Sequence, residues 1–84
     1  MSEVFVVSWS YKLDSGESGF DVELFDSFEK AMEWINNDIE SEQEANLVLE
    51  EGEREFTKEY GGSYWFKSHG YNSFDWNLRV RKVK

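Results

Sequence analysis

His69, the only histidine of the chain, is the first residue whose type could support catalysis, because an imidazole can act as a general base. It stands between Ser68 and Gly70 in a predicted turn, and no serine or acid lies around it at the spacing of a known catalytic motif. We therefore expect an exposed turn residue, no catalytic residue and no enzyme.

Metal and phosphate chemistry have equally little support in the sequence. The chain has no cysteine and one histidine, so only oxygen ligands for a hard cation are available. Asp14, Ser15 and Glu17 carry oxygens but lack the order of a calcium loop. Gly61 and Gly62 lie between predicted strands and not before a helix, so they do not form a phosphate loop. We expect no metal and no cofactor.

Acidic side chains are concentrated in the middle of the chain. Residues 14–59 hold sixteen carboxylates and three cations, whereas residues 60–84 hold five cations and one carboxylate. Such a field repels nucleic acid and anionic membranes and attracts cationic surfaces. The acidic candidates for partner contact follow one another in and after a predicted helix: Glu40, Glu42, Glu44, Glu50, Glu51, Glu53 and Glu55. Asp21 and Glu23 are expected on the outer side of a strand. A surface that serves solubility alone remains the plain alternative.

Aromatic residues are dense between residues 60 and 76, where they alternate with serine, glycine and asparagine. In a strand, Tyr64-Trp65-Phe66 must place rings on both faces of a sheet. Packing into a core is one interpretation, and a binding patch with Tyr64, Trp65 and Tyr71 as anchors is the other. The basic residues 79–84 alternate with apolar ones and are typical of the outer face of a strand near the sheet edge.

The elements that position these residues follow from periodicity. Residues 3–13 alternate with Phe5, Val7, Trp9, Tyr11 and Leu13 on one side, which predicts a strand. After a glycine-bearing turn, a second strand is predicted with three apolar residues facing inward: Phe20, Val22 and Leu24.

A helical spacing then joins Phe28, Met32, Ile35 and Ile39, and Asp26 followed by Glu29 predicts a capping box. The helix is expected to end between Ile39 and Glu44. The segment 47–49 is either a strand or a continuation of the helix as far as Gly52.

Three further segments complete the predicted sheet. Residues 53–60 read as a strand anchored by Phe56, Gly61 and Gly62 as a tight turn into residues 63–68, and residues 70–73 as another turn. Residues 74–81 alternate as the last strand. The predicted fold is a single α+β domain, residues 1–84. It has a mostly antiparallel sheet of about five strands, one helix on one face, and the order β-β-α-β-β-β. Without cysteines, a leader or a membrane span, the expected location is the cytoplasm.

The stretch from Val22 to Ile35 resembles small acidic proteins of phages and mobile elements, in which a strand leads into a capped helix through a pattern similar to Phe-Ser-x-x-Glu-Lys-Ala. These proteins are similar in size and acidity to anti-CRISPR and anti-restriction inhibitors, some of which imitate DNA. The resemblance implies a basic host partner that handles nucleic acid, such as a Cas or restriction protein. It carries no functional residues over and leaves a homodimer open.

These observations favour a non-enzymatic inhibitor that places its carboxylates in a cationic groove and binds neither nucleic acid nor membrane directly. The alternative is a small-ligand or carbohydrate module that uses the aromatic residues 60–76. Two measurements distinguish these hypotheses. Added salt should weaken the binding of the inhibitor to its partner, whereas Trp65→Ala should abolish the binding of a small ligand or carbohydrate.

Overall fold

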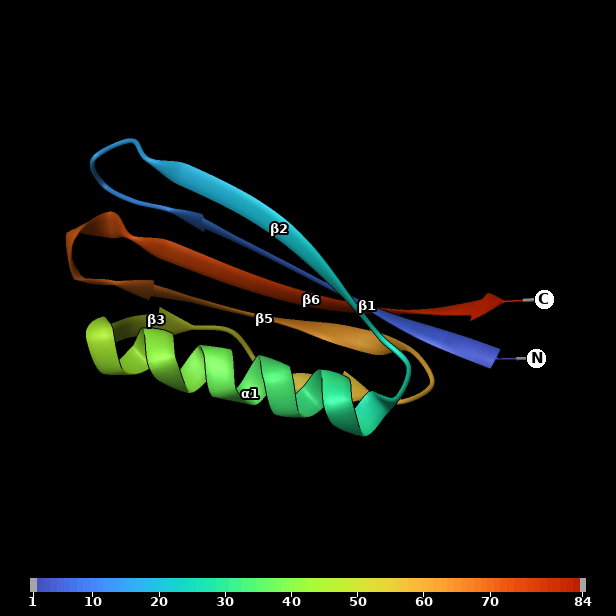
Figure 1. Cartoon of the computed structure of the whole chain (residues 1–84). Helices are drawn as coiled ribbons and strands as arrows, with labels where there is room; N and C mark the ends of the chain where they lie inside the picture. Colours follow the sequence, from blue (N-terminus) through green and yellow to red (C-terminus); the bar gives the residue numbers. More distant parts are fainter. Residues whose placement is uncertain (1, 84) are drawn as a thin grey trace.

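The structure, a computed structural model, describes residues 2–83 and consists of one six-stranded sheet with one helix on one of its faces (Figure 1). The α+β class and the predicted element order are confirmed. The elements are β1 (Ser2–Lys12), β2 (Ser18–Phe25), α1 (Phe28–Ala45), β3 (Val48–Glu51), β4 (Glu55–Thr57), β5 (Gly61–Ser68), the 3₁₀ turn η1 (His69–Tyr71) and β6 (Ser73–Val83).

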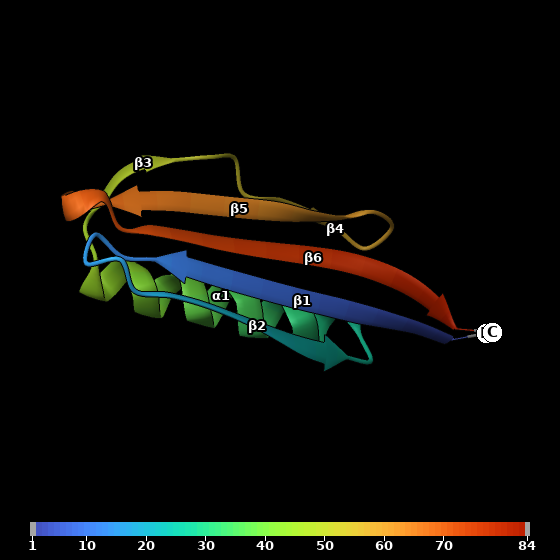
Figure 2. The same cartoon turned by 90° about the horizontal axis from the view of Figure 1, so that it is seen from above.

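The strands are all antiparallel to their neighbours, in the order β2-β1-β6-β5-β3, with β4 also paired to β5 (Figure 2). The sheet has one strand more than expected because the stretch between the helix and Gly61 forms two short strands. Segment 47–49, for which helix and strand were both open, enters β3. The strand expected over residues 53–60 shrinks to Glu55–Thr57.

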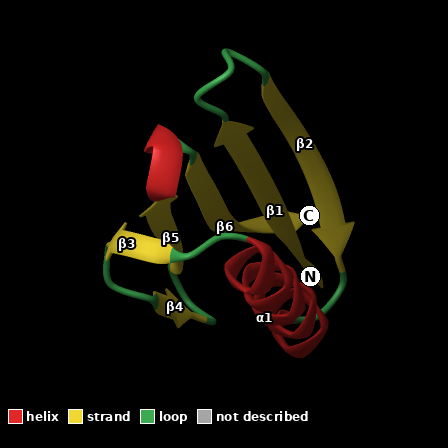
Figure 3. Cartoon of the chain, turned by 90° about the vertical axis from the view of Figure 1, so that its left-hand side faces the viewer, coloured by secondary structure: helices red, strands yellow, loops and turns green. Residues whose placement is uncertain are grey.

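The core lies between the sheet and α1, which Figure 3 shows nearly end-on beside the strands. The core consists of apolar residues at alternating strand positions and on one side of the helix: Phe5, Val7, Ala31, Ile35, Ile39, Tyr64, Phe66, Phe74, Trp76 and Leu78. The predicted inward side of β1 is confirmed, because Phe5 and Val7 are buried and Trp9 packs against Trp34 of the helix at 4.4 Å between ring centroids. Aromatic rings of β5 and β6 are stacked, with 4.9 Å between Phe66 and Phe74.

The inward side predicted for β2 is wrong. The register pairs Phe5 with Phe25 and Val7 with Glu23, and directly opposed residues share a face. Asp21 and Glu23 therefore stand on the helix side, not on the outer side. The apolar residues expected inside, Phe20, Val22 and Leu24, are exposed on the outer face.

The helix cap, the end of the helix and one turn also differ from the prediction. Ser27, not Asp26, caps the helix, since its Oγ accepts the amide of Lys30 at 3.2 Å while Asp26 forms an ion pair with the Lys30 side chain. The helix extends to Ala45, one residue past the expected range. Gly61 and Gly62 begin β5 instead of forming the turn, which lies at residues 58–60.

Candidate partner-binding surface

The outward face of α1 is a continuous acidic surface. Ala31, Ile35 and Ile39 turn one side of the helix into the core. Helical spacing then places four exposed carboxylates on the other side: Glu29, Glu33, Glu40 and Glu44. With a rise of 1.5 Å per residue these four groups extend over about 22 Å. We call them the acidic helix face.

Within residues 2–83, the carboxylates of the acidic helix face have no cationic partner within 4.0 Å. Among residues 2–83, the one ion pair joins Lys30 Nζ to Asp26 Oδ1 at 3.2 Å, and both side chains are exposed. Arg79 and Arg81 pair with Val6 and Val4, which point away from the core, so these cations lie on the opposite face of the sheet. Lys82, in contrast, is opposite Glu3 and so stands on the helix side of the sheet, but it forms no ion pair within 4.0 Å with a carboxylate of the helix.

Two other acids of the helix have structural surroundings. Asp38 Oδ2 accepts a hydrogen bond from Trp76 Nε1 at 2.8 Å and so joins the helix to β6. Glu42, one of the predicted contacts, is only partly exposed. Burial raises the pKa of the Glu42 carboxyl above its usual value, and the negative charge of Asp38 one turn earlier raises it further.

Tyr64 was predicted as a surface anchor, and this is wrong because its side chain is fully buried. Its hydroxyl accepts from Gln43 Nε2 at 2.8 Å and donates to Glu51 Oε1 at 2.9 Å, a chain of bonds that links α1 to β3. The pKa of Tyr64 is raised, chiefly by burial and then by the Glu51 carboxylate, although the Arg54 guanidinium, 4.7 Å from the ring centroid, acts against this.

The predicted acidic contacts divide between two faces of the molecule. Glu40 and Glu44 lie on the acidic helix face, and Glu51 lies on the helix side through its bond to Tyr64. On the outer side, Glu50 and Glu55 pair with Lys67 and Ser63, which alternate with the buried residues of β5. Glu53 lines a depression of the outer side together with Glu55 and Trp65. The structure therefore does not bring all seven glutamates into one surface.

The aromatic candidates are also separated. Trp65 is half-buried on the outer side, where its carbonyl accepts from the Gly52 amide at 3.0 Å and its indole fills the space a side chain at Gly52 would need. Tyr71 is exposed in η1 with a positive φ of 65° and borders a different depression, formed with Leu49 and His69. No single patch contains both rings.

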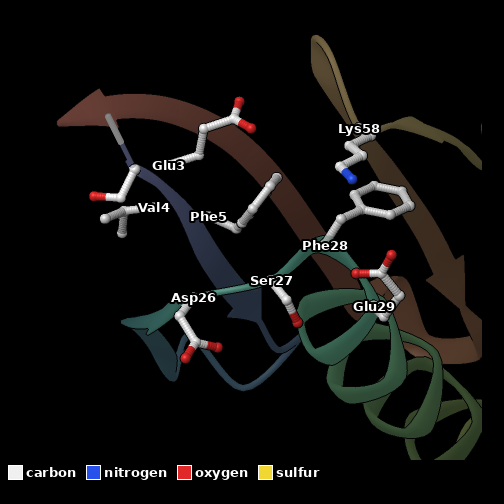
Figure 4. Close-up of a pocket in the computed structure, with 9 residues that line it drawn as sticks. Glu3, Val4, Phe5, Asp26, Ser27, Phe28, Glu29 and Lys58 are labelled. Carbon is white, nitrogen blue, oxygen red and sulfur yellow. The ribbon is translucent and has the colours of Figure 1, made fainter.

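The start of α1 adds further acidity beside the acidic helix face. Asp26 and Glu29 line a depression there with Glu3 of β1, above the rings of Phe5 and Phe28 (Figure 4). Figure 4 shows Lys58 reaching toward Phe28 from the turn after β4. No group of three or more acidic or histidine side chains that could hold a metal ion occurs in residues 2–83.

Glu29 and Glu33 belong to this surface but are not among the sequence candidates for partner contact. The available signal was the four- and seven-residue spacing that joins them to Glu40 and Glu44 on the side opposite the apolar stripe. The part of the chain that the structure describes contains no helix long and apolar enough to cross a membrane. No protein-family model, curated protein or solved structure matches the chain.

Proposed function

We propose that the protein is a non-enzymatic binding protein whose acidic helix face occupies a cationic surface of a nucleic-acid-binding partner and excludes nucleic acid from it. The observation that carries the proposal is the row of four exposed carboxylates that have no cationic partner within 4.0 Å in the described part of the chain. Unpaired charges of one sign on a rigid element attract an opposite surface over distance and speed association.

The charge density of the helix sets how close this imitation of nucleic acid is. The four carboxylates span about 22 Å and are separated by three intervals that average roughly 7 Å, whereas one strand of duplex DNA carries a charge per about 3.4 Å. The acidic helix face thus presents about half the density of a single strand. At the helix start the acidity is partly balanced, because Asp26 is ion-paired with Lys30 and Lys58 lines the same depression as Glu3. We expect binding that weakens as salt screens these charges.

The experiment begins with affinity capture from the natural host, and the captured protein is then purified for competition measurements. Duplex DNA should displace the protein from this partner. Combined replacement of Glu33, Glu40 and Glu44 by lysine should weaken binding by about 100-fold, because it reverses the attraction.

A matched control carries the same change in net charge at exposed positions away from the helix: Asp14→Lys, Glu17→Lys and Asp75→Lys. This control should retain binding within a few-fold. A partner that holds duplex DNA and this protein at the same time, or one that loses affinity equally in both variants, would contradict the proposal.

The carbohydrate alternative loses most of its platform in the fold. Four of the rings between residues 60 and 76 are in the core: Tyr64, Phe66, Phe74 and Trp76. Tyr60, Trp65 and Tyr71 remain at the surface: Tyr60 and Trp65 line one depression, and Tyr71 borders another. Two rings in one depression leave a carbohydrate a much smaller platform than the seven aromatic residues of this segment.

A further inference from the structure

Strand β2 is an open edge of the sheet. Its eight residues pair with β1 on one side and with no strand on the other among residues 2–83 (Figure 2). The opposite edge is different, because β3 has four residues with an irregular register and β4 has three. Short, irregular strands protect an edge from pairing, whereas a long regular strand invites it.

The outer side of β2 is apolar and accessible. Phe20, Val22 and Leu24 are 72%, 42% and 62% exposed. Their neighbours on β1 are Ser10, Ser8 and Val6, so the apolar row of β2 continues onto β1 only at Val6. Three exposed apolar side chains in one row can pack against the side chains of a further strand that adds beside β2.

The backbone groups that face away from β1 belong to the same residues. The Val22 amide donates to the Asp21 side chain, Oδ1, at 2.8 Å. An amide that bonds to a side chain of its own strand is one that β1 leaves free. Because free and paired residues alternate along an antiparallel strand, Phe20, Val22 and Leu24 form the free row.

The charges of β2 select the kind of strand that can pair with it. Asp21 and Glu23 stand on the helix side and are exposed, and no cation of residues 2–83 lies within 4.0 Å of either carboxylate. Two-fold pairing of β2 with a second copy places Asp21 opposite Glu23, or either residue opposite itself. Opposed like charges destabilise a strand pair, so the charges disfavour a second copy and favour a cationic strand.

We propose that β2 is a docking edge for an extended basic segment of a partner protein, which adds to the sheet as a further strand. Its apolar residues lie beside Phe20, Val22 and Leu24, and its lysines or arginines alternate with them beside Asp21 and Glu23. Main-chain hydrogen bonds supply affinity and the alternation supplies specificity. This edge is separate from the acidic helix face.

The test uses a synthetic peptide that alternates valine and lysine, compared with a peptide of the same composition whose valines and lysines are in two blocks. In an NMR titration of the full chain, the alternating peptide should shift the amide signals of residues 20–24. The block peptide should bind at least about ten-fold more weakly. Val22→Pro removes an amide that is not bonded to β1 and would be needed to bond an added strand. The substitution should therefore weaken peptide binding about ten-fold while the fold is retained. Leu24→Lys is a second variant with the same expected direction.

Leu49→Lys is the matched control, because Leu49 is an exposed leucine, 59% accessible, at the opposite edge. It should leave the affinity for the peptide unchanged. Equal binding of both peptides, shifts confined to α1, unchanged affinity in Val22→Pro, or formation of a β2-paired dimer in place of peptide binding would overturn the proposal. Lysine replacements on the acidic helix face should leave peptide binding within a few-fold, which separates this edge from the proposed function.

Discussion

The indole Nε1 of Trp76 lies 2.8 Å from Oδ2 of Asp38 and donates a hydrogen bond that joins β6 to α1. Trp76 is almost completely buried, so loss of this acceptor leaves its N–H without a partner. Asp38→Leu should lower the free energy of unfolding by about 2 kcal/mol, whereas Asp38→Asn keeps an acceptor and should cost less than about 1 kcal/mol. Urea unfolding of the two variants measures the difference, and equal losses would exclude this role.

The same substitution should change the acidity of Glu42. Burial is the first cause of its raised pKa and the charge of Asp38 is the second. In Asp38→Asn the pKa of Glu42 should fall, because a like charge is removed, but should stay above 4.5 because the burial remains. NMR titration of the Glu42 carboxyl measures both values. A pKa that is unchanged by the substitution would show that Asp38 does not act on it.

Tyr64 should make stability depend on alkaline pH. Because its pKa is raised above 10.0, the folded state holds the phenol proton more tightly than the unfolded chain does. The contribution of this group is therefore complete below pH 10 and is lost as pH rises through the raised pKa. Tyr64→Phe should cost about 1–2 kcal/mol at neutral pH, since two hydrogen bonds disappear.

The measurement is the free energy of unfolding of both proteins at neutral pH and at several values above pH 10. The curves should converge as pH rises, because only the wild type carries this titrating group at position 64. Curves that remain parallel would mean that the Tyr64 hydroxyl does not couple to folding.

Glu44 should oppose stability while it serves binding. It follows Glu40 by four residues on the same exposed side, and the last turn of α1 contains no basic residue. Glu44→Lys converts a like-charge pair into an attractive one and places a cation at the negative end of the helix dipole. The expected gain is about 0.5–1 kcal/mol by thermal or urea unfolding. Glu17→Lys, an equal charge change in the β1–β2 loop, should give no comparable gain.

Tyr71 should be replaceable with a gain in stability. Its φ of 65° lies in the left-handed region, which costs a tyrosine about 1 kcal/mol relative to residues that tolerate it. Its side chain is 86% exposed, so few contacts are lost. Tyr71→Asn should raise the free energy of unfolding by roughly 0.5–1 kcal/mol. Tyr60→Asn is the control, since Tyr60 is equally exposed and has no positive φ, and it should not stabilise.

Periodicity predicted the class and order of the fold because each element repeats its own pattern over many residues. Phe5, Val7 and Trp9 alternate along β1, and Ala31, Ile35 and Ile39 follow the turn of α1. In β2 the same reasoning gave the wrong side. Alternation separates two faces but does not say which of them a helix covers, and the register with β1 decides that.

The partner-binding surface was predictable only in part. Glutamates near the helix end were recognised, but their division between two faces depends on strand pairing that composition does not reveal. Tyr64 could not be assigned either. In the run Tyr64-Trp65-Phe66, Trp65 lies on one face of the sheet and the other two rings lie on the opposite face. The position of α1 determines that Trp65 is on the outer face.

The central pair of the sheet has a kinetic consequence. β1 and β6 pair along eleven residues, from Ser2 with Val83 to Lys12 with Ser73. The β1–β2 hairpin closes a short loop and can form early, but β6 must find β1 across almost the whole described chain. Closing that long loop gives little reward until β5 and the helix are also in place. We therefore expect folding on a slow timescale for a domain of this size, with collapse onto β1 as its last step.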